Sequence, residues 1–229
     1  MPLITMSCVL MQILWLMMMH LNFKKNPKLG AVTGNPRIRN KSSILGKIQT
    51  IEYSSLIGCI KHSQSLAGAV NTISGVFTLF KKSALKEVDH WDTDMITEDI
   101  TVSWKLHLSG FQIKYEPRAL CWMLVPETIG GLWKQRVRWA QGGREVLLRD
   151  FWVTMKSRKI PLYLLMFEQI ISITWVYVVL IYLAFLLVTA NFLDYTYLKY
   201  SFSIFFFSSF TMTFINIIQF TVALFIDSR

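Results

Sequence analysis

Two short groups of residues have the types and spacing that proton transfer and phosphate binding require. The first is Thr97-Glu98-Asp99, which stands directly before an amphipathic run and therefore at the predicted start of a helix. A carboxylate at a helix start often serves as a cap, and for a lone aspartate capping is the more common role. A carboxylate beside a bound substrate can instead remove a proton from a hydroxyl group. The sequence leaves both roles open for Asp99.

The second group is Gln135-Arg136-Val137-Arg138-Trp139, within a basic stretch that is rich in aromatic residues. On a helix, Gln135, Arg138 and Trp139 share one face because they are three and four residues apart. The Arg138 guanidinium is a planar fork of donors that suits a diphosphate. The Trp139 ring is a flat apolar surface that suits a sugar. Taken alone, the same residues would also suit a helix that lies on a membrane surface.

Two long apolar stretches predict membrane helices. Residues 170–188 and 200–226 contain no charged side chain, and about 20 apolar residues are enough to cross a bilayer. We therefore predict a membrane domain over residues 161–229, with spans near 165–188 and 201–226.

Basic residues on the flanks of these spans predict their orientation. Lys156, Arg158 and Lys159 precede the first span, whereas the loop between the spans carries the single lysine Lys199. Cytoplasmic flanks are usually enriched in lysine and arginine. We therefore expect residues 28–160 to form a cytoplasmic domain.

The charge balance is strongly basic, with 24 lysines and arginines, 14 acidic residues and a net charge of +10. No zinc-ligand spacing, arginine-rich run or helix-turn-helix pattern supports nucleic-acid binding. An anionic membrane surface and a diphosphate-bearing substrate account for the charge equally well. The cysteines Cys8, Cys59 and Cys121 are scattered and form no CxxC pair, so they predict neither a disulfide framework nor a metal site.

Strand patterns alternate with helix patterns between residues 28 and 160, which predicts an α/β domain with a mostly parallel sheet. The expected strands are residues 31–33, 75–80 and 111–117, with a turn at Gly34-Asn35-Pro36 after the first. The expected helices begin after Ser42 or Ser43, near Ser83, at Glu98 (ending at Gly110) and after Glu127, the last with a break at Gly142-Gly143.

The two candidate motifs occur in a fixed order, about 35 residues apart, and membrane spans follow them. This combination resembles the processive family 2 glycosyltransferases, which make cellulose, chitin, hyaluronan and poly-N-acetylglucosamine. Within that family the chain is most similar to the synthases of poly-β-1,6-N-acetylglucosamine, from about Lys28 to its last residue. The stretches that carry this resemblance are GAVTGNPRIRN, NTISGVFTLFKKSAL, WDTDMITEDI and CWMLVPETIGGLWKQRVRWAQGG.

The resemblance implies a GT-A-like catalytic domain in a multi-pass protein of the bacterial cell membrane. It implies processive transfer of N-acetylglucosamine, with inversion, from UDP-N-acetylglucosamine to a growing β-1,6-linked biofilm polysaccharide. Asp99 of the Thr97-Glu98-Asp99 motif would be the general base, and Gln135, Arg138 and Trp139 would bind the acceptor and the diphosphate. A divalent Mg²⁺ or Mn²⁺ ion and a small membrane accessory subunit are expected as well. Two alternatives stay open: a hyaluronan- or chitin-type synthase, and a non-catalytic membrane remnant.

One element of the family pattern is missing. Family members have an earlier Asp-x-Asp that holds the metal ion, shortly before the stretch that begins at Gly30, but no aspartate precedes Asp89 here. Asp92 and Asp94 have the right spacing, yet they lie only a few residues before Asp99, where the family has an acidic loop. We therefore predict no metal ligand in this chain.

Residues 1–27 begin with an almost uncharged apolar run, which at face value is a signal anchor or a first membrane helix. The codons suggest a second interpretation. With the reading frame set back by one base, the pairs Met17-Met18 and Met18-Met19 must each encode aspartate. The other codons of residues 7–20 permit CLDADTxVDDDA, which contains the missing Asp-x-Asp. We interpret residues 1–27 as an aberrant, frameshifted N-terminus, and we expect an incomplete domain in a truncated and impaired copy.

Overall fold

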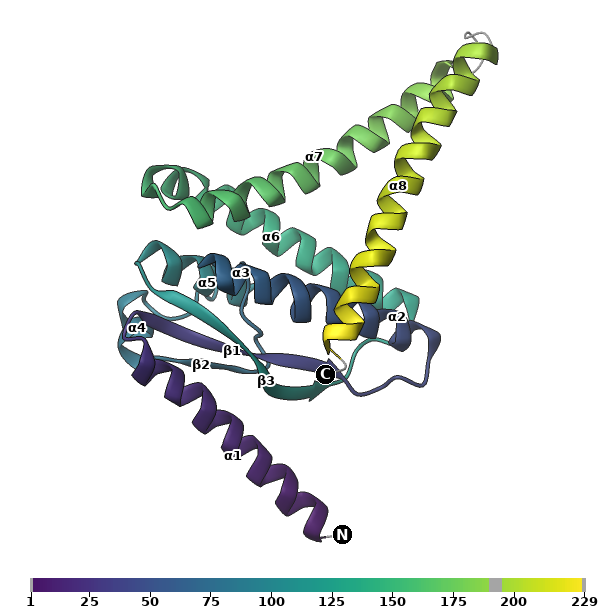
Figure 1. Ribbon diagram of the computed structural model, residues 1–229. Coiled ribbons are helices and arrows are strands. Elements are labelled where there is room, and N and C mark those ends of the chain that lie inside the picture. Colours follow the sequence, from purple (N-terminus) through teal and green to yellow (C-terminus); the bar gives the residue numbers. More distant parts are fainter. Residues whose placement is uncertain (1, 190–194, 228–229) are drawn as a thin grey trace.

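A three-stranded sheet lies at the centre of the domain with helices on both faces, as Figure 1 shows for the computed structural model, which describes residues 2–189 and 195–227. The strands are β1 (Leu29–Ile38), β2 (Thr78–Phe80) and β3 (Gln112–Met123), in the order β2-β1-β3. β1 is parallel to β3 and antiparallel to β2. The predicted α/β class is confirmed, and the two long strands are parallel, as expected.

β1 continues through Gly34, Asn35 and Pro36, so the turn predicted at these residues is wrong. The ladder to β3 instead changes register between Thr33 and Asn35, and Gly34 N donates to Phe77 O at 2.9 Å. Because β3 lies along β1 on both sides of this point, the turn-forming residues produce an irregularity within the strand and not a reversal of the chain.

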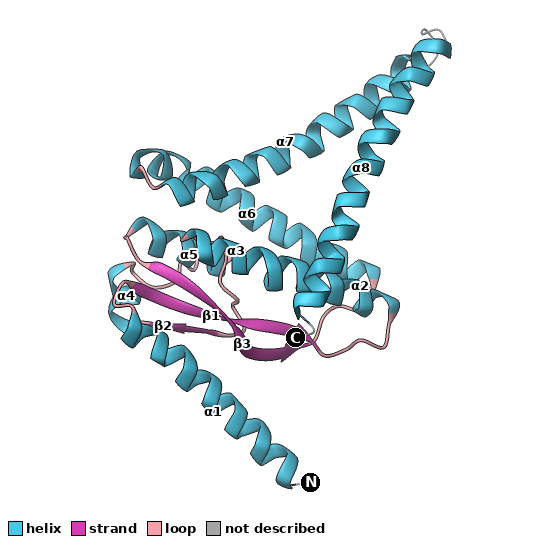
Figure 2. Ribbon diagram, viewed as in Figure 1, coloured by secondary structure: helices cyan, strands magenta, loops and turns pink. Residues whose placement is uncertain are grey.

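One face of the sheet is covered by a continuous helical segment and by a second helix beside it (Figure 2). The segment consists of α2 (Ile44–Tyr53), the π-helix η1 (Ser54–Ile60) and α3 (Lys61–Ala67), and the second helix is α5 (Glu98–Leu108). The Ser43 hydroxyl caps α2 by accepting a hydrogen bond from Gly46 N at 3.0 Å, as predicted.

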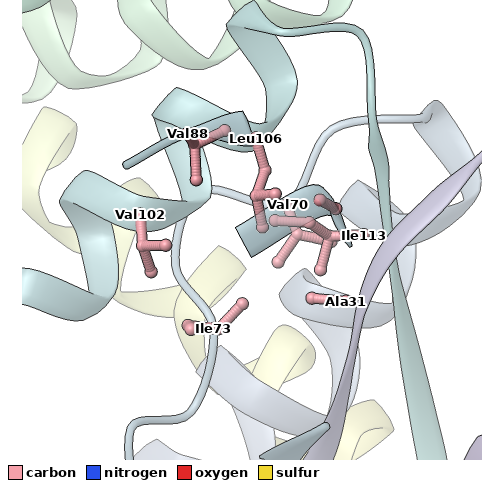
Figure 3. Packing of buried hydrophobic residues seen from close by; sticks show 8 residues of the cluster. Ala31, Val70, Ile73, Val88, Val102, Leu106 and Ile113 are labelled. Atoms are coloured by element: carbon pink, nitrogen blue, oxygen red, sulfur yellow. The ribbon is translucent and has the colours of Figure 1, made fainter. Parts of the chain in front are cut away.

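The main hydrophobic core lies between the sheet and these helices (Figure 3). Its buried members are Ala31, Val70, Ile73, Ala84, Val88, Val102, Leu106 and Ile113. The core fixes α5 against β1 and β3, and it thereby fixes where the first turn of α5 lies relative to the sheet.

The opposite face of the sheet is covered by α1 (Pro2–Lys25), drawn in purple in Figure 1. Met19 is fully buried there, in a cluster with Leu29, Val32 and Ala119. The apolar residues of this segment therefore form a helix that packs on the domain at its C-terminal half. The packing of α1 concerns the amino acids of the chain and does not test the reading frame of the gene. The frameshift interpretation therefore stays a prediction.

The predicted boundaries of β2, α4 and α5 can be compared with those in the structure. β2 begins at Thr78 and not at Gly75, because Phe77 N donates to Ser74 O at 3.0 Å and closes a turn before the strand. The helix predicted next is α4 (Lys82–Glu87). α5 ends just before Gly110, whose φ of +93° is the left-handed conformation that glycine adopts most readily, as predicted.

α6 (Ile129–Ser157) is a single uninterrupted helix, so the break predicted at Gly142-Gly143 is wrong. Gly142 is buried, and a β-carbon at this position would overlap the side chain of Thr97. The glycine is therefore explained by a close contact between α6 and the segment before α5, and not by an end of the helix.

Two long helices, α7 (Ile160–Thr189) and α8 (Tyr195–Asp227), form a hairpin that projects from the domain in Figure 1. Within the described residues, Ile160–Thr189 and Thr196–Val222 are long and apolar enough to cross a membrane. They overlap the two predicted spans. The end of α8 returns to the domain, where Gln219 Nε2 donates to Ser55 Oγ of η1 at 3.0 Å.

Candidate active site

Asp99 lies in the first turn of α5, with its carboxylate facing the segment that precedes β2. The backbone N–H of Ile100 donates to Asp99 Oδ1 at 2.9 Å. Gly75 lies against the other oxygen: a β-carbon added there would be 3.7 Å from Asp99 Oδ2. The carboxylate is therefore half-buried and held in one place, with a glycine rather than a side chain in front of it.

Burial raises the pKa of the Asp99 carboxyl above its ordinary value. The hydrogen bond from Ile100 and the charge of Lys61 act in the opposite direction, whereas the Glu98 carboxylate adds to the rise. A carboxylate with a raised pKa is a stronger base than a solvated one, which favours proton removal from a hydroxyl group.

Thr97 and Glu98 have different surroundings from Asp99. Glu98 is exposed, while Thr97 is buried and is the N-cap residue of α5 without a capping bond from its side chain. Among the described residues, Thr97 Oγ1 has no hydrogen-bond partner. Thr97 instead packs on Gly142, so its role in the structure is steric.

The second predicted group lies on α6 and faces two directions. The Trp139 ring is half-buried against Tyr53 of α2, with ring centroids 6.4 Å apart. Gln135, one turn earlier, is also half-buried, and within the described part of the chain its Oε1 has no hydrogen-bond partner. Arg138 is exposed and lines a shallow hollow of about 250 Å³ beside Trp133 and Lys134. Of the three residues expected on one helix face, Gln135 and Trp139 are therefore turned toward the domain and Arg138 toward solvent.

Arg136 fixes the Trp139 ring, a role that the sequence analysis did not assign. Its guanidinium lies over the ring, 4.5 Å from the centroid, and Arg136 Nη2 donates to Glu52 Oε2 at 2.5 Å. A cation placed over an indole ring is attracted by the ring electrons. The alternation of basic residues on this stretch was visible in the sequence, but the partner on α2 was not.

The two motifs meet where α6 crosses the segment before α5. Gly142 contacts Thr97 directly, and Gly142 is three residues after Trp139 on the same helix. Asp99 is two residues after Thr97. The structure therefore brings the expected base and the expected acceptor motif into one region, although the motifs are about 35 residues apart in the sequence.

The Asp92 carboxylate is already occupied by two cations. Lys105 Nζ donates to Asp92 Oδ1 at 2.8 Å, and Arg149 Nη1 donates to Asp92 Oδ2 at 2.7 Å. Asp94 is exposed. Within the described residues there is no group of three histidine, cysteine, aspartate or glutamate side chains that could hold a metal ion. The described residues therefore do not fit a divalent metal site.

Lys61 is a further residue near Asp99 that sequence reasoning missed. It is buried, and the charges of Lys61 and Asp99 act on each other. One signal was available, because Lys61 is four residues after Ile57 and so continues the apolar face of the helix predicted there. A lysine on the buried side of a helix is uncommon and requires a partner.

The sequence is similar to one known protein family and to curated proteins of the genus Staphylococcus. The sequence profile of the glycosyl transferase family group 2 matches residues 8–226. A poly-beta-1,6-N-acetyl-D-glucosamine synthase of Staphylococcus epidermidis is 86% identical over 208 residues, which are 91% of this chain and 50% of that protein. The protein with the same name from Staphylococcus aureus is 82% identical over the same coverage. The chain spans about half the length of the curated relatives it matches.

One solved structure has a similar fold. A mannosyltransferase from Pyrobaculum calidifontis, in complex with GDP-Man and Mn²⁺, superimposes with a TM-score of 0.58 at 16% sequence identity. The match covers 89% of this chain and 53% of the mannosyltransferase. At this identity the likeness concerns the fold alone, which is the GT-A-like arrangement.

Proposed function

The chain belongs to the glycosyl transferase family group 2, and from this membership we propose that it carries the catalytic base of a poly-β-1,6-N-acetylglucosamine synthase. The reaction is transfer of N-acetylglucosamine from UDP-N-acetylglucosamine to a growing β-1,6-linked exopolysaccharide. The observation that supports it best is the contact between Gly142 and Thr97, because Gly142 is three residues after Trp139 and Thr97 is two residues before Asp99. The 86% identity to a protein named as this synthase supports the choice of sugar.

In the proposed mechanism, Asp99 takes the proton from the 6-hydroxyl group of the acceptor sugar. The acceptor oxygen forms a bond to the anomeric carbon of the donor while the bond from that carbon to the UDP oxygen breaks on the opposite face, which inverts the configuration. UDP leaves with the bonding electron pair, and Asp99 keeps the proton. The raised pKa of Asp99 suits this step.

The residues of α6 have separate tasks in this proposal. Trp139, held by Arg136 and Tyr53, stacks on the acceptor sugar, and the amide of Gln135 hydrogen-bonds to its hydroxyl groups. Arg138 is free to approach the diphosphate from the exposed side, where positive charge stabilises the leaving group. Mg²⁺ or Mn²⁺ would supply further positive charge to the departing diphosphate, as the Mn²⁺ in the mannosyltransferase complex suggests for the fold. The residues described in this chain provide no place for it.

We also propose which part of the chain lies in the cytoplasm and which part lies in the membrane. Residues 28–160 form the cytoplasmic catalytic domain and residues 161–229 belong to a multi-pass membrane domain of a bacterial cell membrane. α6 lies at the interface, because its outer side exposes Trp133 and Trp152, each 70% exposed, among basic residues. Residues 1–27 are the aberrant segment, and a small membrane subunit is the expected partner.

A second function is favoured by one observation. The missing cluster of metal-binding side chains in the described residues suits a membrane remnant without catalysis. Such a remnant would keep the fold and the contacts of α7 and α8 but would not depend on Asp99. The two functions therefore differ in what happens when Asp99 alone is changed.

The test uses a chimaera in which this chain replaces the matching segment of the Staphylococcus epidermidis synthase, from residue 28 onward. Asp99→Asn should lower incorporation of labelled N-acetylglucosamine about 10²- to 10⁴-fold, the usual contribution of a general base, and should leave donor binding intact. Asp94→Asn is the matched control, because Asp94 is exposed in the preceding loop. Wild-type synthesis by the Asp99→Asn chimaera would exclude the proposed mechanism. A chimaera that makes polymer from UDP-glucuronate as well would support a hyaluronan-type donor.

A further inference from the structure

Lys61, the first residue of α3, is a lysine that is almost completely withdrawn from water. Only 5% of the residue is exposed, although burial of an ammonium group is costly unless the charge is compensated. Its Nζ donates to Ser74 Oγ at 3.0 Å. Burial lowers the pKa of Lys61 to about 8, and the charge of Asp99 opposes that shift. The ammonium therefore has a neutral hydrogen-bond partner in Ser74, and the Asp99 carboxylate is near enough for its charge to act on Lys61.

Ser74 connects Lys61 to the sheet and to the base. The backbone N–H of Ser74 donates to Thr33 Oγ1 of β1 at 2.8 Å. The next residue, Gly75, is the one whose missing side chain leaves room for Asp99, with 3.7 Å from an added β-carbon to Asp99 Oδ2. Lys61 and Asp99 therefore approach adjacent residues of the same short segment.

The segment is tied to α5 from its other end. Ile73 N donates to Ser103 Oγ at 3.0 Å, and the same hydroxyl donates to Asp99 O at 2.6 Å. A series of hydrogen bonds, joined by the peptide bond between Ile73 and Ser74, thus runs from Lys61 to the first turns of α5. A change at Lys61 acts on the base both through this series and through its charge.

We propose that Lys61 is a positioning residue for the base, which holds residues 73–75 beneath Asp99 through Ser74 and keeps the Asp99 carboxylate ionised through its positive charge. The inference rests on the function proposed above for Asp99. Lys61 acts through Asp99 and is not itself a catalytic residue.

The charged groups around the carboxylate support this assignment. They are the Lys61 ammonium from α3 and the Glu98 carboxylate from the same turn of α5, together with the backbone N–H of Ile100. Burial and Glu98 both favour the protonated form of Asp99, which cannot accept a proton. The positive charge of Lys61, which lies beside residues 73–75, favours the ionised form of Asp99 and so opposes both effects.

The test is a titration of Asp99 in the 229-residue chain in detergent micelles. Infrared difference spectra taken across a pH series show the carboxyl band of protonated aspartate, and Asp99→Asn identifies the part of the band that belongs to this residue. Lys61→Met removes the charge and the hydrogen bond, whereas Lys61→Gln removes the charge and retains an N–H donor for Ser74. Both should move the Asp99 midpoint to higher pH, while Lys61→Arg should leave it in place.

Lys86→Met is the matched control, because it removes an exposed lysine of α4 and should leave the midpoint unchanged. In the chimaera, the acidic limb of the rate of synthesis should move in the same direction as the midpoint. A midpoint that stays in place in Lys61→Gln and Lys61→Met would overturn the inference. A shift in Lys61→Met alone would assign the effect to the hydrogen bond and overturn the role of the charge.

Circular dichroism identifies any variant that fails to fold, and that variant is left out. Lys61→Gln and Lys61→Arg then still test the role of the charge, because they differ mainly in charge. The outcome is also separable from the proposed function. Full synthesis by the Asp99→Asn chimaera would reject Asp99 as the base whatever the titration shows. Loss of synthesis in that chimaera, together with an unmoved midpoint, would reject only the role of Lys61.

Discussion

Substitution of Gly142 by alanine is a sensitive test of how the two motifs are held together. In the interior of a helix this change normally stabilises a protein, because alanine is favoured over glycine by about 1 kcal/mol. Here the added methyl group would overlap the side chain of Thr97 in the segment before α5. The packing cost and the gain in helix propensity therefore have opposite signs.

Gly143 separates the two contributions. It occupies the next position of the same helix, and a β-carbon there would have no atom within 4 Å. Gly143→Ala should show the helix gain alone, about 1 kcal/mol, whereas an overpacked core position typically costs about 1–3 kcal/mol. The difference between the two variants is then the packing term itself, about 1–3 kcal/mol, because the gain in propensity cancels.

Denaturant unfolding of the 229-residue chain in micelles measures this difference, and the chimaera measures synthesis. We expect Gly142→Ala to be less stable than Gly143→Ala and to lose much of its polymer synthesis, because Asp99 follows Thr97 by two residues. Thr97→Ala should restore part of the loss in the Gly142→Ala background, since it removes the hydroxyl and methyl groups that the new β-carbon meets. Equal stability and equal synthesis of the two alanine variants would refute the idea that Gly142 joins the motifs.

The remaining predictions concern charge, stability and the gene. In the chimaera, Arg138→Ala should weaken inhibition by UDP and Trp139→Ala should not; equal effects would refute their separate roles. Asp92→Asn should cost about 1 kcal/mol of stability, as for partly exposed ion pairs. Burial raises the pKa of Asp92, but the hydrogen bonds from Lys105 and Arg149 outweigh burial and hold the pKa below its ordinary value. The contribution of Asp92 to the free energy of unfolding is therefore present near neutral pH and is lost as the pH falls through that lowered pKa. Membranes that contain only the 229-residue chain should incorporate almost no N-acetylglucosamine with Mg²⁺ or Mn²⁺, and rates near those of an intact synthase would contradict this. The codons of residues 7–20 should encode an LDADT-like run in the alternative frame. The shift would be rejected if the codons of Leu10 and Gln12 both end in a base that cannot form an aspartate codon.

Local signals predicted the elements whose causes are themselves local. Ser43 caps α2, Gly110 ends α5, and the uncharged stretches form α7 and α8, because in each case the deciding atoms are within a few residues or a single helix. The position of Asp99 at the start of α5 follows from the same kind of signal. Its half-burial does not, because the carboxylate lies against Gly75, 24 residues earlier in the chain, and burial is the main cause of its raised pKa.

The failures share a different cause. Gly142 was interpreted as a break because glycine is unfavourable in helices, yet its contact is Thr97, which lies 45 residues earlier in the chain. Gly34 was interpreted as a turn although β3 pairs with the strand on both sides of it. Lys61 and Arg136 received no role, since the partners that define them are on other elements. A local pattern can mark such a residue as unusual, as the apolar helix face marks Lys61, but it does not identify the distant partner that sets the role.

The position of Asp99 also depends on α7, the first of the two candidate membrane helices. Trp104 of α5 is fully buried in a cluster with Val146 and Leu147 of α6 and Met166 of α7. Its indole N–H donates to Asn71 Oδ1 at 3.1 Å, and Gln169 Nε2 of α7 donates to the same oxygen at 2.7 Å. The helix that carries Asp99 is thus packed against both α6 and the first candidate membrane helix. Because close-packed interiors transmit displacement, the position of the carboxylate depends on how α7 is seated as well as on the sheet beneath it.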